Sequence, residues 1–293
     1  MLHKIRLRIN LVLFIALLAV STSSIFARFV PELSAVVIAF WRMAIASVLI
    51  WIYTFFRGQK KIDSRQYKYY LLSGIFLALH FSSFYGAVKL TSIANATLLG
   101  ITAPMFTILY EKIFLKRKLN PIIFIGFVLA GTGSLIITGS GLLVQDNSLA
   151  GKMLGLLAAM FIALVYIFAS NLREKANTVS YTRLLYSYAA FFLLIICLIT
   201  DNTVFHFSFR EFSWLLLLGL VPTILGHSLF YYSIKFTSPT VVSSVPIGEP
   251  IIASLLAWAL FSETITFATM IGGLFILVGI YFLITNSPKN LPE

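Results

Sequence analysis

Charged residues are scarce in this chain of 293 amino acids, where Asp, Glu, Lys and Arg together make up only 11%. A soluble domain usually carries about 25%. Hydrophobic residues reach 59%, and the 27 phenylalanines outnumber the 22 Lys and Arg residues. Because so little polar surface cannot keep a folded chain in water, the composition predicts a protein solvated by lipid. It excludes a soluble enzyme and a disordered regulator.

Cysteine is almost absent as well, since Cys197 stands alone in an apolar run and no intrachain disulfide can form. The sequence also lacks a phosphate-binding glycine loop, a nucleophile elbow and a zinc-spaced Cys/His cluster. We therefore expect no enzyme, no cofactor and no metal site. The net charge of +12 comes without basic runs interleaved with aromatics, so it indicates basic loops of a membrane protein rather than nucleic-acid binding.

Long apolar runs dominate what remains. A helix needs about 20 apolar residues to cross the hydrocarbon layer, and ten stretches meet this need with only short connections between them. We predict an all-α integral membrane protein whose first, basic-led span is retained as a helix. The ten predicted transmembrane helices cover about 9–28, 34–56, 67–88, 91–114, 120–141, 151–171, 181–200, 211–234, 238–261 and 265–285.

Lys and Arg fall unevenly between the two sides of this arrangement. If the N-terminus lies in the cytoplasm, 17 of the 22 basic residues lie on the inner side and 4 on the outer side, and Arg42 lies within a span. Positive charge accumulates on the cytoplasmic side of membrane proteins. The sequence therefore predicts a multi-pass protein of the inner, cytoplasmic membrane with both termini in the cytoplasm.

A repeat lies at half the length of the chain. Displacing the sequence by 146 residues aligns 84–133 with 230–279 without a gap, and eleven of the fifty columns are identical. Five spans per repeat is an odd number, so the second copy enters the bilayer in the opposite sense. We predict two inverted repeats, 1–145 and 146–293, an arrangement that secondary transporters use around a site at the midplane.

Two segments of these repeats carry a family resemblance. Residues 101–115, followed by Gly126 and Gly133, resemble the C-terminal part of an EamA domain, and 248–263, followed by Gly272 and Gly279, resemble it more closely. The shared pattern is a proline, an aliphatic run, a Glu and a glycine-bearing last helix. Phe40-Trp41-Arg42 also resembles an aromatic-Arg pattern in the second span. The chain is thereby similar to the drug/metabolite transporter superfamily.

The resemblance implies ten spans in two EamA repeats and transport of a small solute, with export as the commoner direction. It says almost nothing about the substrate, for which amino acids and related metabolites are the leading class. In one departure, Glu263 of the second repeat aligns with Arg117 of the first, so the role of that acid cannot be assumed twice. A passive channel or facilitator, or a lipid-acting membrane enzyme, is the alternative function.

Ionisable groups inside a span cost a few kcal/mol and normally face the bundle interior or an aqueous cavity. Glu249, near the midplane, is expected to bind a cationic group or carry a coupling proton. Arg42 either binds a carboxylate or forms a structural clamp, and each histidine either carries a proton or is satisfied by a neighbouring carbonyl. The predicted solute-binding residues are Arg42, His80, Tyr85, Asn95, His227, Tyr231 and Glu249.

Small residues and prolines mark a structural set. Prolines deep in matched spans free a backbone carbonyl and bend the helix, and small residues spaced along a span let helices approach closely. Glu111, among several basic residues, is expected to form a local salt bridge. The predicted structural or hinge positions are Pro104, Pro250, Gly126, Gly133, Gly272 and Gly279.

Overall fold

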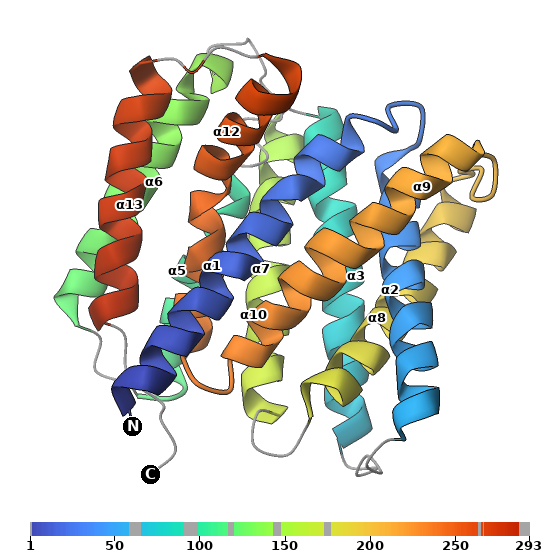
Figure 1. The fold of residues 1–293 in the computed structure, drawn as a ribbon, viewed down its shortest axis with the longest axis horizontal. Coiled ribbons are helices and arrows are strands. Elements are labelled where there is room, and N and C mark those ends of the chain that lie inside the picture. The colour runs from blue at the N-terminus through green and yellow to red at the C-terminus, as the bar shows by residue number, and fades with distance from the viewer. Residues whose placement is uncertain are drawn as a thin grey trace.

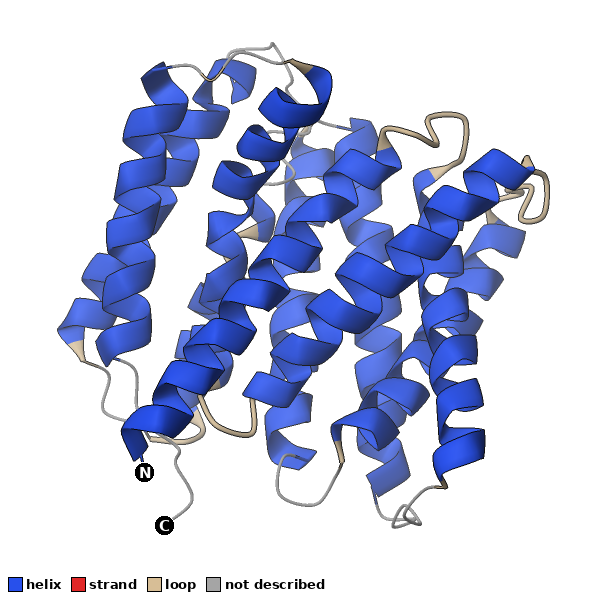
Figure 2. Ribbon diagram, in the orientation of Figure 1, coloured by secondary structure: helices blue, strands red, loops and turns tan. Residues whose placement is uncertain are grey.

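The computed structural model describes residues 2–58, 66–90, 99–116, 120–142, 148–172, 177–262, 265 and 267–286. Within these ranges the chain forms helices and connecting turns, and no strand (Figure 2). In chain order the helices are α1 Leu2–Ala27, α2 Ala35–Arg57, α3 Tyr67–Leu90, α5 Ala103–Ile113, α6 Pro121–Leu142, α7 Leu149–Leu172, α8 Thr178–Ile199, α9 Phe209–Leu218, η2 Gly219–His227, α10 Ser228–Ser233, α11 Pro239–Ser244, η3 Val245–Gly248, α12 Glu249–Phe261 and α13 Phe267–Asn286.

Seven helical stretches of the described chain are long and apolar enough to cross a membrane. They correspond to the first three and the sixth to ninth predicted spans. Two shorter apolar helices, Pro121–Ile136 and Phe267–Leu283, correspond to the fifth and tenth. The fourth predicted span is represented by α5, because 91–98 lie outside the described residues. The all-α membrane fold is therefore confirmed, and the count of ten stays a prediction.

The starts of several helices follow from their capping residues. The Ser34 side chain accepts a hydrogen bond from the Val37 backbone N–H at the start of α2, and Asn177 caps α8 in the same way. Ser208 and Glu211 form a reciprocal capping box at the start of α9. Such caps satisfy backbone donors that the first turn leaves free, so the connections between spans can stay short.

Three helix pairs make the most extensive contacts: α6 with α13, α3 with α7, and α2 with α8. Figure 1 shows α6 and α13 together at one edge of the bundle, while α1 crosses beside α10 and α12. The main core lies between α1, α2, α3, α7, α8 and α10. Cys197 belongs to this core and is fully buried.

Two spans are interrupted. Between α9 and α10 the chain widens into the π-helix η2, which contains Pro222. Between α11 and α12 it tightens into the 3-10 turn η3. Both interruptions place irregular backbone inside an apolar bundle, where unpaired backbone groups are tolerated only if protein or water satisfies them.

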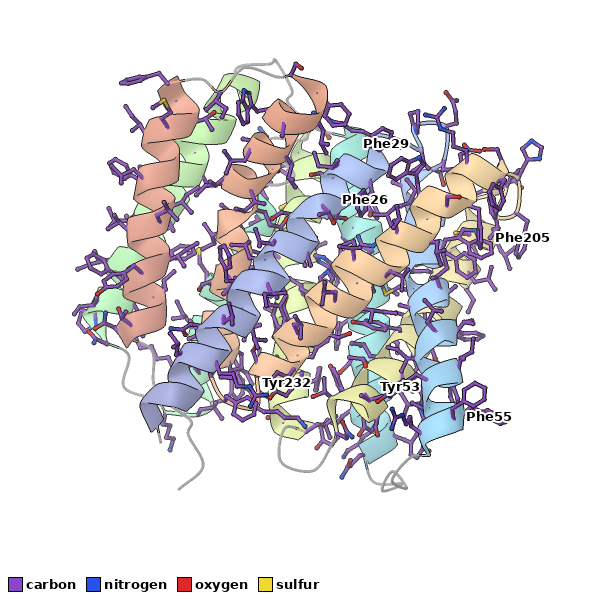
Figure 3. All side chains as sticks on the ribbon, in the orientation of Figure 1. Phe26, Phe29, Tyr53, Phe55, Phe205 and Tyr232 are labelled. Carbon is purple, nitrogen blue, oxygen red and sulfur yellow. The ribbon has the colours of Figure 1, made fainter. Side chains whose placement is uncertain are left out.

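Large apolar side chains cover the outside of the bundle. Phe55 and Phe209 are 83% and 86% exposed, and many Leu, Ile and Phe side chains of α6, α12 and α13 are exposed as well. Figure 3 shows Phe26, Phe29 and Phe205 in one half of the molecule and Tyr53, Phe55 and Tyr232 in the other. An apolar surface this extensive is unfavourable in water and matches a lipid environment.

Candidate functional site

Arg42 is buried in the middle of the bundle. Its side chain is 3% exposed. Its Nε donates a hydrogen bond to the Thr223 hydroxyl at 3.3 Å, and its Nη1 donates to the Ser23 hydroxyl at 3.1 Å. The guanidinium carbon lies 4.9 Å from the centre of the Phe81 ring. These partners come from α1, α3 and η2 and are all neutral, so they orient the guanidinium without cancelling its charge.

The proline in η2 explains how Thr223 reaches Arg42. In an α-helix the N–H of residue 222 would bond to the Leu218 carbonyl, but Pro222 has no N–H. The Thr223 hydroxyl donates to that carbonyl instead, at 2.8 Å. Its oxygen remains able to accept the bond from Arg42. The Thr223 carbonyl, in turn, accepts a hydrogen bond from the Tyr186 hydroxyl at 3.2 Å.

His227 and Tyr231 stand one turn apart, on η2 and α10. The His227 Nδ1 and the Tyr231 hydroxyl are both buried, and neither has a hydrogen-bond partner in the described part of the chain. The two rings stack with centroids 6.4 Å apart, and the His227 ring also meets the edge of Phe81 at 6.2 Å. Phe81 therefore contacts both His227 and the Arg42 guanidinium.

Tyrosines surround Tyr231, which is 3% exposed. The ring centroids of Tyr166, Tyr181 and Tyr186 lie 5.9, 5.3 and 6.5 Å from that of Tyr231. The Tyr186 hydroxyl is satisfied by Ser228 and the Thr223 carbonyl. The hydroxyl of Tyr231, at the centre of this group, is buried and has no hydrogen-bond partner among the described residues.

His80 is satisfied locally. Its Nδ1 lies 2.8 Å from the Ala158 carbonyl of α7, and since a carbonyl only accepts, Nδ1 carries the proton. Its ring stacks near Phe84 at 6.3 Å. Tyr85 is half-buried and lies 6.2 Å from the Phe81 ring. Both residues lie beside Arg42 and the three residues that hold it, Ser23, Phe81 and Thr223, which we call the Arg42 group.

Glu249 is the first residue of α12, directly after the η3 turn. It is half-buried and interacts electrostatically with Arg42 and with Tyr166. The interrupted span therefore places a carboxyl group, at a helix start, within the electrostatic reach of the Arg42 group.

The predicted structural residues lie at helix starts and at one close contact. Pro104 and Pro250 occupy the first turns of α5 and α12, where a missing N–H costs little. Between α6 and α13, helix backbones touch at the predicted glycines: a Cβ added to Gly279 would lie 2.5 Å from the Gly126 carbonyl oxygen. Gly133 faces the carbonyl of Gly272 in the same way.

Glu111 makes a contact that its local sequence does not indicate. The residue is fully buried, and its Oε1 accepts a hydrogen bond from the backbone N–H of Thr240 at 3.3 Å. One turn earlier on α5, the Thr107 hydroxyl lies 3.0 Å from the Ser243 hydroxyl of α11. These two hydrogen bonds join the end of the fourth predicted span to the start of the ninth.

Several residues of the site were not predicted, and some predicted ones cannot be placed. Ser23, Phe81, Thr223 and Tyr186 all help to hold Arg42, and Pro222 was the sequence signal for the irregular span that carries Thr223. The predicted positions outside the described residues are Asn95, Arg117 and Glu263.

A separate hollow of about 680 Å³ lies at one end of the bundle. It is formed by the connection from α1 to α2 and the connection from α8 to α9, and its lining includes Glu32, Asp201, His206 and Glu211. Among the predicted solute-binding residues that the structure describes, none lines it, so it is distinct from the Arg42 group.

Comparison with known proteins agrees with this architecture. The sequence profile of the EamA-like transporter family matches residues 7–139 and 149–285. The chain is 27% identical to the pseudopaline exporter CntI of Pseudomonas aeruginosa, over 90% of this chain and 92% of that one. It is 25% identical to solute carrier family 35 member G1 of Mus musculus, over 88% and 73% of the two chains.

The fold itself is also known. A protein of solved crystal structure superposes with a TM-score of 0.81, over 94% of this chain and 98% of that chain, at 16% sequence identity. The two profile matches together cover most of the chain, and the named relatives are transporters and not enzymes. This multi-pass membrane protein therefore belongs to the EamA-like transporter family, within the drug/metabolite transporter superfamily.

Proposed function

We propose that the chain is a secondary transporter that exports a small organic solute, an amino acid or a related metabolite, across the cytoplasmic membrane. It works by alternating access of two inverted repeats of five helices, 1–145 and 146–293. Both termini lie in the cytoplasm. The solute binds at the centre of the bundle, between the repeats.

The observation that carries this proposal is the position of Arg42. A charged side chain deep in a membrane bundle is expensive and marks a pathway or binding site. Here the guanidinium is held by Ser23 and Phe81 from the first profile match and by Thr223 from the second. A solute at this point touches both halves, as alternating access requires.

The helix contacts support two similar halves related by a twofold axis. If the two halves are exchanged, the third and sixth spans become the eighth and the first. The α3–α7 pair therefore corresponds to a pair between α1 and the span that runs from α9 to α10. The pairs α2–α8, α5–α11 and α6–α13 each join equivalent spans of the two halves, so the exchange leaves them unchanged. All of these pairs are in contact. A twofold relation between the halves produces this pattern, and the odd number of spans in each proposed repeat makes the axis lie in the membrane plane.

Glu249 is proposed to bind the amino group of the solute or to carry a coupling proton. It lies at a break in the ninth predicted span and within electrostatic reach of Arg42. Broken helices at the midplane supply such sites in transporters. When the solute leaves, a proton on the carboxyl group would remove a charge that is costly at this depth.

The test is counterflow in proteoliposomes loaded with a mixture of the twenty proteinogenic amino acids. We expect saturable exchange of at least one labelled amino acid, and its acceleration by an imposed pH gradient. Glu249→Gln should abolish the response to the gradient. If the natural protein and Glu249→Gln each show equal flux with and without the pH gradient, proton coupling is contradicted. Flux that never saturates favours a passive facilitator.

The proposed orientation has its own test. Cysteine is introduced at Asn202, in the connection after α8, and separately at Lys235, in the connection after α10. An impermeant maleimide added to intact cells should label the Asn202→Cys protein and spare the Lys235→Cys protein, which reacts only after lysis. Labelling of both from outside contradicts the predicted topology.

A further inference from the structure

Three polar groups at the centre of the bundle lack a hydrogen-bond partner among the described residues. Arg42 uses Nε and Nη1 for Thr223 and Ser23, and its Nη2 donates to none of the residues that the structure describes. The Tyr231 hydroxyl and the His227 Nδ1 are buried without a partner in the same part of the chain. A buried polar group without a hydrogen-bond partner is costly, so Tyr231 and His227 need a partner that the described residues do not provide, and Arg42 has a donor available for the same partner.

The three groups form one cluster. The Phe81 ring lies against the Arg42 guanidinium on one side and against the His227 ring on another. The His227 ring in turn stacks with Tyr231. A second connection runs from Arg42 through Thr223 to Tyr186, whose ring lies 6.5 Å from that of Tyr231. Consistent with this, Arg42 interacts electrostatically with both His227 and Tyr231.

We propose that Arg42, His227 and Tyr231 form the subsite that binds the carboxylate group of the transported solute. This inference rests on the proposed function, because it assigns one chemical group of the solute to one side of the central site. It also assigns Ser23 and Thr223 as positioning residues that aim the guanidinium.

A carboxylate fits these groups chemically. Its two oxygens accept about four hydrogen bonds, while arginine only donates and the phenol and the imidazole can each donate one. Charge-assisted bonds of this kind are shorter and stronger than neutral ones. Arg42 is the member that is charged at every physiological pH, so a monoanion balances the cluster. A dianionic phosphate would leave an uncompensated charge within the membrane, which is unfavourable.

The structural clamp, the other interpretation of Arg42, requires a permanent partner that is an acid or a set of helix-end carbonyls. The groups that touch the guanidinium are two hydroxyls and a phenyl ring. Glu249 acts on Arg42 at longer range and is itself half-buried. The guanidinium is therefore positioned by neutral groups and keeps a free donor, which is the arrangement that an anion-binding residue needs.

The experiment compares amino acids with their amides. Purified protein in detergent is titrated with each of the twenty proteinogenic amino acids and with the corresponding amide, which keeps the amine and side chain but has no carboxylate. Thermal stabilisation and calorimetric affinity are measured. We expect at least one amino acid to bind at least about tenfold more tightly than its amide, since a hydrogen bond to a charged group contributes about that much.

Two variants locate the preference. Tyr231→Phe should weaken binding of the acid about tenfold and leave amide binding unchanged. It should not lower the midpoint of the unliganded protein, because the hydroxyl it removes has no partner among the described residues. Tyr232→Phe, the neighbouring residue on α10, is the matched control and should keep the preference. Arg42→Gln should abolish it. A purely structural role of Tyr231 would not separate acid from amide.

Three results would overturn the assignment: no binding by any of the twenty acids, equal affinity for acid and amide, or a larger stabilisation by inorganic phosphate than by any acid. Counterflow of the same acid keeps this test separate from the proposed function. Tight, Tyr231-dependent binding without counterflow supports the carboxylate subsite and contradicts transport. Counterflow of acid and amide at equal rates supports transport and contradicts the carboxylate subsite.

Discussion

The contact between α6 and α13 offers the sharpest test of the fold. At Gly279, a methyl group would lie 2.5 Å from both the Ala130 nitrogen and the Gly126 carbonyl oxygen. These are backbone atoms and cannot rotate away, so Gly279→Ala must push the helices apart. Restoring an ordinary contact of 3.4 Å requires a displacement of about 0.9 Å.

A displacement of this size affects the whole interface. Overpacking a well-filled interior by a methyl group typically costs about 1–3 kcal/mol, and transmembrane helices depend on close contact because lipid gives them little hydrophobic drive to associate. We expect Gly279→Ala to lower the free energy of unfolding by that amount. Thermal unfolding in detergent, followed by tryptophan fluorescence, measures the change.

Gly131 provides the matched control. It lies on α6 in the same apolar surroundings, but a methyl group added there meets nothing within 4 Å. Because alanine is a better helix former than glycine by about 1 kcal/mol, Gly131→Ala should leave the midpoint unchanged or raise it. If Gly279→Ala is as stable as the natural protein, or if both substitutions destabilise equally, the close backbone contact is not as the structure has it.

Three further outcomes are expected. Ser208→Ala removes the capping box of α9 and should destabilise by about 1 kcal/mol, whereas Ser213→Ala, inside the same helix, should cost less; equal losses in thermal unfolding would contradict the cap. Ser187→Ala leaves the Trp51 indole N–H without its acceptor and should lower stability by about 1 kcal/mol; an unchanged midpoint would show that the bond contributes nothing. The Thr107 and Ser243 hydroxyls lie 3.0 Å apart, so the double variant Thr107→Cys/Ser243→Cys should crosslink on oxidation and stop counterflow until a reductant is added. Each single variant should keep its counterflow under the same oxidation. Full flux in the crosslinked protein would mean that α5 and α11 do not separate during transport.

Sequence alone was sufficient for the class of fold because every span is a local signal. Twenty apolar residues in a row identify a helix without any knowledge of its neighbours. The depth of Arg42 in the second predicted span likewise predicted a buried charge, and it is buried. These properties depend on position along one helix, which the sequence states directly.

The partners of that charge could not be predicted. Ser23 lies 19 residues from Arg42 and Thr223 lies 181 residues away, so their meeting depends on how whole helices cross. The π-helix at Pro222 was equally hidden, because proline is common in membrane helices and does not state which irregular turn it will produce. Glu111 shows the same limit, since it reaches Thr240 in the other half of the chain.

The burial of Cys197 makes the natural chain a convenient starting point for spectroscopy. A thiol enclosed by the core is shielded from maleimide and methanethiosulfonate reagents. Spin labels or fluorophores can therefore be attached to newly introduced pairs of cysteines without first removing a native one. Interprobe distances in lipid, with and without solute, would then report how far the two halves travel.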